Sequence, residues 1–372
     1  MEQIWRLYKG LSGVLRTHYP NFALGLPLGR NEIPIFIYHD VEPESFAADL
    51  EFLRRNRYQT LSLQEFIQRS GGQGVRSNAV LLTFDDARKS FHSVALAVLR
   101  EFGARATLFA PTYWMNSADP TRAPADDLFM SWDELRDCTE SGLVDVQSHA
   151  HRHALVCVSD RVVGFATPEL LSRYDIYDWP MRHTSAGDQL GRPALGTPIY
   201  EAAPLLSASG RFLESEAAAR ACCESVERAG GAGFFSQPDW LKQLRRVHDL
   251  ALAEQPGRYL PAAQFQALVA SEFEQSRDQF RHHLGYAPSS LAYPWMLGSR
   301  LSLDLAARFD IKSVFGVALD YGHARNAQLP VRVFGRLKAD WLPTLPGQGR
   351  SNLASVAARK LSGFSKTMHL AH

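Results

Sequence analysis

Short apolar runs alternate with helical periodicity over much of the chain. Apolar runs bounded by polar sequence predict buried strands, and apolar residues three and four positions apart predict helices with one buried face. The predicted strands are residues 33–38, 79–84, 106–110, 144–148, 291–294, 313–317 and 331–334, and the predicted helices are residues 45–55, 63–70, 90–102, 132–141, 264–284 and 303–309. This order of strand and helix predicts an α/β fold whose strands form a barrel.

The strand and helix order is interrupted between residues 156 and 260. This stretch has no internal repeat, and it contains an aromatic segment at 174–180, a Gly- and Pro-rich run at 187–204 and a predicted helix at 213–229. We interpret it as an insertion that is either a structural flap or a wall of a substrate cleft. The predicted division is residues 31–155 and 261–345 for a discontinuous barrel, 156–260 for the insertion, and 1–30 and 346–372 for terminal segments.

Carboxylate and imidazole side chains stand at the ends of two predicted strands. Asp85 and Asp86 follow one strand, and His149 and His153 follow another. Barrel enzymes place active-site groups at the carboxyl ends of strands. Two imidazoles and one carboxylate can bind a metal while leaving positions for water and substrate. The plainer interpretation is that the aspartates cap a helix and the histidines lie on the surface.

Two other histidines have less certain roles. His39 closes the first predicted strand, where barrel enzymes keep active-site groups, although a single histidine is more often structural. His151 lies between the two candidate ligands in the sequence. Because successive side chains of a strand point to opposite sides, we do not expect His151 to bind the same metal.

At these residues the sequence resembles the polysaccharide deacetylases of the NodB-homology, carbohydrate esterase family 4 type. The resemblance is carried by Thr-Phe-Asp-Asp at 83–86, Ser-His-x-x-x-His at 148–153 and Leu-Ala-Tyr-Pro-Trp at 291–295, with flanking similarity at 33–41, 106–110 and 131–135. It covers residues 33–155 and 273 to about 341, and the motifs occur in the family order. The resemblance implies a distorted (β/α) barrel and a metal-dependent enzyme.

The resemblance also implies roles for individual residues. Asp86, His149 and His153 are expected to bind a divalent metal, and Asp85 to accept a proton from water. A metal activates water and polarises an acyl carbonyl, whereas a carboxylate beside it can receive the proton. Zn2+ is the favoured metal, and Ni2+, Co2+, Mn2+ and Fe2+ are alternatives. The residues expected to contact substrate are Tyr293, Pro294, Trp295 and His39.

The chain departs from the family pattern at three positions. Ala87 stands where many members have glycine, and Ala292 stands where many have an arginine that pairs with the base. Arg332 or Arg336 could supply that cation from a later strand, and we assign it to Arg332. The final family motif contains a histidine that acts as general acid. Here only His372 follows a similar pattern, so the acid is left unassigned.

The composition of the chain limits the cellular compartment and the binding partners that we expect. The 372 residues carry a net charge of +1, which gives no reason to expect a nucleic acid. The four cysteines, Cys138, Cys157, Cys222 and Cys223, do not have the density of a disulfide scaffold and favour a reducing compartment. Neither a membrane span nor the apolar core of a signal peptide is evident. We therefore expect a cytoplasmic protein without a signal peptide, and nothing in the pattern indicates an oligomeric state.

Both ends of the chain are basic and amphipathic. Residues 1–30 carry a charge of +3 and residues 346–372 carry +4, which leaves −6 for the remainder. Apolar residues lie on one side of each predicted helix. These helices either pack on the barrel or make a peripheral contact with the inner face of the membrane.

The expected reaction is removal of an N-acetyl group from an amino sugar in a polysaccharide, oligosaccharide or lipid-linked glycan. Removal of a formyl or O-acetyl group is an alternative, because activated water attacks either carbonyl. A third interpretation is a homologue that binds glycans without catalysing a reaction. The absence of the family's arginine and of its final-motif histidine favours this interpretation. The paired carboxylates argue against silence, since a binding protein has no need of a proton acceptor beside a metal.

Overall fold

A computed structural model describes residues 21–29, 32–70, 78–115, 128–316, 318–319 and 329–352. The predicted terminal helices and His372 lie outside these residues. Among the described residues, no helix combines the length and apolar character needed to cross a membrane.

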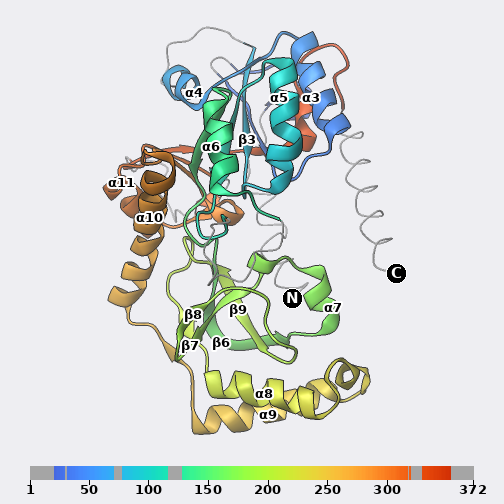
Figure 1. Ribbon diagram of the computed structural model, residues 1–372, viewed down its shortest axis with the longest axis vertical. Coiled ribbons are helices and arrows are strands. Elements are labelled where there is room, and N and C mark those ends of the chain that lie inside the picture. The colour runs from blue at the N-terminus through green and yellow to red at the C-terminus, as the bar shows by residue number, and fades with distance from the viewer. Residues whose placement is uncertain are drawn as a thin grey trace.

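The principal sheet is parallel and curls into a distorted barrel, as predicted (Figure 1). Its strand order is β16 (Arg332–Phe334), β14 (Ser313–Phe315), β12 (Ser290–Ala292), β5 (Val144–Ser148), β4 (Ala106–Ala110), β3 (Ala79–Phe84), β1 (Ile35–Tyr38) and β17 (Leu337–Lys338), with β2 (Gln59–Thr60) beside β3. β16 and β17 are the first and last strands of this order. Only two residues of the chain connect them.

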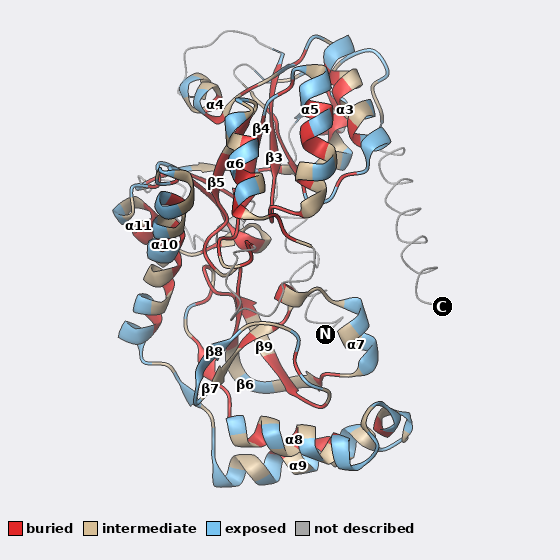
Figure 2. Ribbon diagram, in the orientation of Figure 1, coloured by how far each residue is buried: buried red, intermediate tan, exposed pale blue. Residues whose placement is uncertain are grey.

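Helices cover the outside of this barrel (Figure 1). They are α3 (Pro43–Arg55), α4 (Leu63–Arg69), α5 (Leu96–Phe102), α6 (Trp132–Glu140), α10 (Ala262–Leu284) and α11 (Arg300–Arg308), and a π-helical turn, Phe91–Ala95, precedes α5. In α3 the spacing of Phe46, Leu50 and Leu53 turns one face to the core, as the sequence predicts. All six residues of β3 are buried, which explains their nearly continuous apolar pattern (Figure 2).

A second sheet follows the histidine strand, and the sequence pattern did not predict it. Its strands run in the order β8 (Gly187–Gln189), β7 (Pro180–Thr184), β6 (Leu155–Phe165) and β9 (Pro198–Pro204). Nearby are α7 (Pro168–Arg173), α8 (Glu216–Arg228), α9 (Trp240–Glu254), β10 (Phe212–Leu213) and β11 (Arg258–Tyr259). The strands β13 (Leu297–Gly298) and β15 (Ala318–Leu319) form a further pair. Short 3-10 turns cover Asn21–Leu24, Ile176–Asp178, Gly231–Ser236, Pro294–Met296 and Ala339–Thr344.

Two apolar clusters hold this second region in place. Phe165, Cys222, Val226, Phe234 and Leu244 form a core of its own, between the sheet and the pair α8 and α9. A larger cluster combines residues of the second sheet, such as Val156 and Met181, with residues of α10, α11 and the barrel strands. The helix α10 brings the chain back to the barrel (Figure 1). The two regions therefore share buried apolar surface, which stabilises their contact.

Candidate active site

The candidate residues come from the carboxyl ends of neighbouring parallel strands. Asp85 and Asp86 follow β3, and His149 follows β5. Parallel strands end at the same edge of the barrel, so residues far apart in the sequence meet there.

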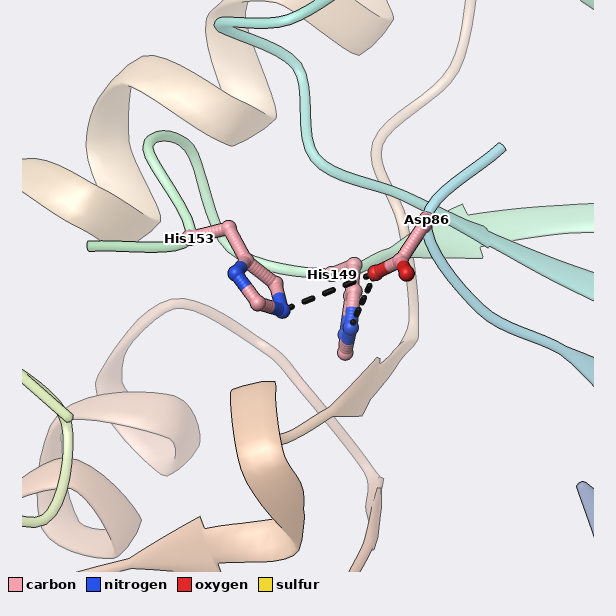
Figure 3. Close-up of side chains that lie close together, drawn as sticks. All are labelled: Asp86, His149 and His153. Carbon is pink, nitrogen blue, oxygen red and sulfur yellow. Dashed lines mark ion pairs between the residues drawn. The ribbon is translucent and has the colours of Figure 1, made fainter. Parts of the chain in front are cut away.

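Asp86, His149 and His153 form a compact group that suits a metal ion (Figure 3). Their candidate ligand atoms all lie within 4.8 Å of one another. The Nε2 atoms of His149 and His153 lie 3.4 Å and 3.5 Å from Oδ1 of Asp86. The three residues are only 1–4% exposed, and this Oδ1 atom has no hydrogen-bond partner among the described residues. A buried acceptor without a donor, facing two imidazoles, fits a divalent cation.

The orientation of His149 is set by a backbone contact. Its Nδ1 atom donates a hydrogen bond to the carbonyl oxygen of Ala292, 2.8 Å away, at the end of β12. This bond places the proton on Nδ1 and leaves Nε2 with a free lone pair for a metal.

The pKa values of the two histidines move in opposite directions. Burial lowers the pKa of His153 to about 3, so this imidazole is neutral and can donate its lone pair. Burial also disfavours the charged form of His149, but the carboxylates of Asp85 and Asp86 outweigh it and raise the pKa. A metal that binds here competes with protonation of His149, which makes binding dependent on pH.

Asp85 lies beside this group and is paired with a cation. Its two carboxylate oxygens accept hydrogen bonds from Nη1 and Nη2 of Arg336 at 2.6 Å and 2.8 Å. Burial raises the pKa of Asp85, but Arg336 and then His149 more than offset this, and the net pKa is lowered. Oδ2 of Asp85 lies 3.6 Å from Nε2 of His149. Asp85 is therefore an ionised carboxylate at the edge of the candidate metal group.

The assignment of this cation to Arg332 is wrong. Arg332 begins β16, and its Nη1 donates to the carbonyl oxygen of Ile67. Arg336 follows the same strand at its carboxyl end. Four residues of extended chain span about 13 Å, so the two arginines lie at opposite ends of the barrel strand. Arg336 is fully enclosed and packs its guanidinium over the ring of Phe109.

The backbone of the turn after β3 departs from strand geometry. Asp86 and Ala87 have φ values of 70° and 47°, in the left-handed region. The chain has therefore left the strand, and alternation no longer separates the side chains, which both approach His149. The left-handed backbone at Ala87 also explains why glycine suits this position.

The histidine loop is held by a carboxylate from α10. Glu272, which is 1% exposed, accepts hydrogen bonds from the backbone amides of His151 and Arg152 and from the Arg152 side chain. The side chain of His151 is engaged elsewhere, with Nδ1 2.8 Å from the hydroxyl of Thr112. His151 is not among the three candidate ligands.

Tyr177 is a contributor that the sequence did not identify. It belongs to the second region, and its hydroxyl donates to Oδ2 of Asp86 at 2.9 Å. Arg88 donates a short hydrogen bond to the same hydroxyl and also bonds Asp175. The only indication of this residue in the sequence was the aromatic segment at 174–180. That segment belongs to the insertion, which we interpreted as either a structural flap or a wall of a substrate cleft. Tyr177 orients one oxygen of Asp86 and leaves the other for a metal.

The predicted substrate residues lie around the same edge. Trp295 has φ 50°, and its ring centroid is 4.2 Å from that of His153. Tyr293 is fully buried and bonded through its hydroxyl to Ser302, so it supports the loop from inside. Pro294 is buried between them, whereas His39 is exposed at the end of β1 and close enough to lower the pKa values of both aspartates. Trp295 and His39 therefore remain the accessible candidates.

Comparison with known proteins identifies this arrangement. The sequence profile of the polysaccharide deacetylases matches residues 72–171, which include both aspartates and both candidate histidine ligands. Over these residues the chain is similar to the polysaccharide deacetylase family. It is also 30% identical over 144 residues to the poly-β-1,6-N-acetyl-D-glucosamine N-deacetylase of Escherichia coli. That similarity covers 33% of this chain and only about a fifth (21%) of the length of the relative.

The chain also resembles solved structures, one of which supports its fold. A de-N-acetylase from Aggregatibacter actinomycetemcomitans aligns with 88% of this chain and 98% of its own, at 15% identity and a TM-score of 0.50. The deacetylase domain of BpsB from Bordetella bronchiseptica aligns with 82% of this chain and 96% of its own, at 20% identity and a TM-score of 0.49. At such identities the first likeness establishes the fold alone.

Proposed function

We propose that this polysaccharide deacetylase relative hydrolyses the N-acetyl group of an amino sugar in a glycan. The observation that carries the proposal is the buried Asp86, His149 and His153 group, with the Arg336-paired carboxylate of Asp85 beside it. The name of the Escherichia coli relative makes N-acetylglucosamine polymers the first substrates to test.

The proposed roles follow from the contacts of each side chain. Asp86, His149 and His153 would hold a divalent metal, for which we propose Zn2+. When bound, such an ion polarises an acyl carbonyl and makes water more acidic. Asp85, kept ionised by Arg336, accepts the proton as water adds to the acyl carbon. The amide C–N bond then breaks as its nitrogen takes up a proton, and the products are acetate and a free amine.

The proposal is tested by metal content and acetate release from N-acetylglucosamine oligomers. Asp86→Ala and His149→Ala should bind less than stoichiometric metal. Asp85→Asn should keep the metal but lose about 10²-fold or more in turnover, since only the proton acceptor has changed. His151→Asn is the matched control, because its side chain faces Thr112, and it should retain both metal and turnover. Full metal in both ligand variants, or normal turnover of Asp85→Asn, would reject the assignment.

A further inference from the structure

Arg88 follows the two aspartates in the sequence, and its side chain contacts the second region. It is 7% exposed, and its Nη2 atom donates hydrogen bonds to Oδ2 of Asp175, at 2.8 Å, and to the hydroxyl of Tyr177. Its guanidinium also lies over the rings of Phe129 and Tyr177, whose centroids are 5.4 Å and 5.0 Å away. Charge-assisted hydrogen bonds and ring contacts together fix this guanidinium in one position.

The hydrogen bonds run in one direction, from Arg88 through Tyr177 to Asp86. A guanidinium only donates hydrogen bonds, and an ionised carboxylate only accepts them. The Tyr177 hydroxyl accepts from Arg88 and carries a single proton, which it donates to Oδ2 of Asp86, 2.9 Å away. Because hydrogen bonds in such a chain polarise one another, Arg88 strengthens the bond between Tyr177 and Asp86.

The two carboxylate oxygens of Asp86 therefore have different surroundings. Oδ2 accepts from Tyr177 and lies 3.7 Å from Nε of Arg88. Oδ1 has no hydrogen-bond partner among the described residues, and the Nε2 atoms of His149 and His153 lie 3.4 Å and 3.5 Å from it. Rotating the carboxylate to present both oxygens to the imidazoles would break its hydrogen bond with Tyr177. Asp86 is therefore arranged to offer a metal one oxygen.

The number of oxygens that a carboxylate offers affects which metal a site prefers. Zn2+ is commonly bound by three protein ligands in tetrahedral sites that keep a fourth position open, and imidazole suits it well. Two imidazoles and one carboxylate oxygen supply such a set. Mn2+ favours oxygen ligands in an octahedral arrangement, so it gains more from a carboxylate that offers both oxygens. Restricting the carboxylate to one oxygen therefore favours Zn2+ relative to Mn2+.

We propose that Arg88 is a positioning residue that acts through the Tyr177 hydroxyl to restrict Asp86 to one metal-binding oxygen, and that this restriction favours Zn2+ over Mn2+. The inference rests on the proposed function, because it takes Asp86 as a metal ligand. The barrel supplies Arg88 and Asp86, whereas the second region supplies Tyr177 and Asp175. The second region therefore influences the choice of metal, although the three candidate ligands lie outside it.

The affinities for Zn2+ and Mn2+, measured by competition with a chelating dye, test this role without turnover. In Tyr177→Phe, Kd for Zn2+ should rise about tenfold or more, as expected when a contact that orients a metal ligand is lost. Kd for Mn2+ should rise less, because the second oxygen of Asp86 becomes available and offsets part of the loss. The preference for Zn2+ over Mn2+ should therefore fall by at least about threefold.

Arg88→Met should lower the same preference, because methionine keeps an unbranched side chain but has no group that donates to Tyr177. The loss of a positive charge strengthens the attraction of both divalent cations alike, so this effect cancels in the ratio of the two Kd values. In the Tyr177→Phe background, Arg88→Met should change the ratio little further, since the hydroxyl through which it acts is already absent.

Arg211→Met and Tyr200→Phe are matched controls within the second region. Arg211 is also buried and donates to a carboxylate, that of Asp188, at 2.6 Å. The hydroxyl of Tyr200 lies 2.8 Å from Nε2 of His248. Neither control residue contacts Asp86 or Tyr177 through these bonds, so both variants should keep the metal preference of the unchanged chain. Thermal unfolding checks that every variant is folded.

The outcomes distinguish this inference from the proposed reaction. An equal change in Kd for the two metals in folded Tyr177→Phe would overturn the positioning role, and so would fully additive effects of the two substitutions. A metal preference that depends on Arg88, without acetate release, would reject the proposed reaction alone. Acetate release by a chain whose preference is the same in these variants would reject the positioning role alone. Absence of metal binding by the unchanged chain would overturn both.

Discussion

Arg336 and Asp85 form an ion pair that is fully enclosed beside the candidate metal group. Removing one partner from a buried pair typically costs about 3–5 kcal/mol, because the other charge is left without compensation. The pair also has a chemical consequence. It holds Asp85 in the form that can accept a proton, although burial by itself would raise its pKa.

Arg336→Lys should keep the charge but lose the two parallel hydrogen bonds, and we expect kcat/KM to fall by at least about tenfold. Because the pKa of Asp85 is lowered in the folded chain, its contribution to stability is present above the unfolded pKa and is lost as the pH falls through the folded pKa. A weaker partner moves that loss, and the acidic limb of the pH–rate profile, to higher pH. Arg332→Lys is the matched control. A larger effect at Arg332 would return the role to that residue.

At the scale of elements, the candidate metal group depends on three supports from outside its own two strands. The loop after β5 is held by Glu272 of α10, His149 is oriented by the backbone at the end of β12, and Asp86 is bonded by Tyr177 from the second region. Contacts that orient metal ligands are typically worth about 10–100-fold in metal affinity. The second region is therefore part of the candidate site's framework.

Tyr177→Phe tests this dependence, since it removes one hydroxyl and keeps the ring. We expect metal affinity, measured by competition with a chelating dye, to fall about 10–100-fold without loss of the fold. Tyr286→Phe is the matched control, because its hydroxyl donates instead to the backbone of Val146 at 2.8 Å. Equal metal affinity in the two variants would show that the Tyr177 hydroxyl does not support the metal ligands and that the residue contributes only packing.

At the scale of the whole molecule, the charge is distributed unevenly along the chain. The ends carry +3 and +4, against −6 in the remainder. An anionic membrane attracts nearby Lys and Arg residues by about 1 kcal/mol each, and salt screens that attraction. We propose that the basic ends bring the protein to an anionic membrane surface, where a lipid-linked glycan would be accessible.

Co-sedimentation with anionic vesicles tests this location. The full-length chain should bind at low salt and dissociate at high salt, and replacement of Arg6, Lys9 and Arg16 by Gln should weaken the binding. Replacing Arg228, Arg245 and Arg246, which are exposed on α8 and α9, removes the same charge elsewhere and should have little effect. Negligible binding of the unchanged chain at low salt would rule out this location.

Much of the barrel could be predicted because its signals are local. A buried parallel strand such as β3 needs a run of apolar residues, and α10 needs apolar spacing on one face followed by Gly285, which has φ 79°. The second sheet had no such signal. Its strand β6 is only partly buried, and β9 begins and ends with proline, so neither shows a clear period.

By itself, the sequence determined the α/β class and the positions of the principal barrel strands, since each follows from a short local pattern. Its resemblance to the deacetylase motifs indicated the grouping of Asp86, His149 and His153. Only the tertiary structure decided which arginine pairs with Asp85. Arg332 and Arg336 are both basic residues near β16, and curling of the sheet brings only the residue at the carboxyl end to β3. Glu272 and Tyr177 were likewise revealed by packing between distant elements, because hydrogen bonds over 91 or more residues leave no periodic trace in the sequence.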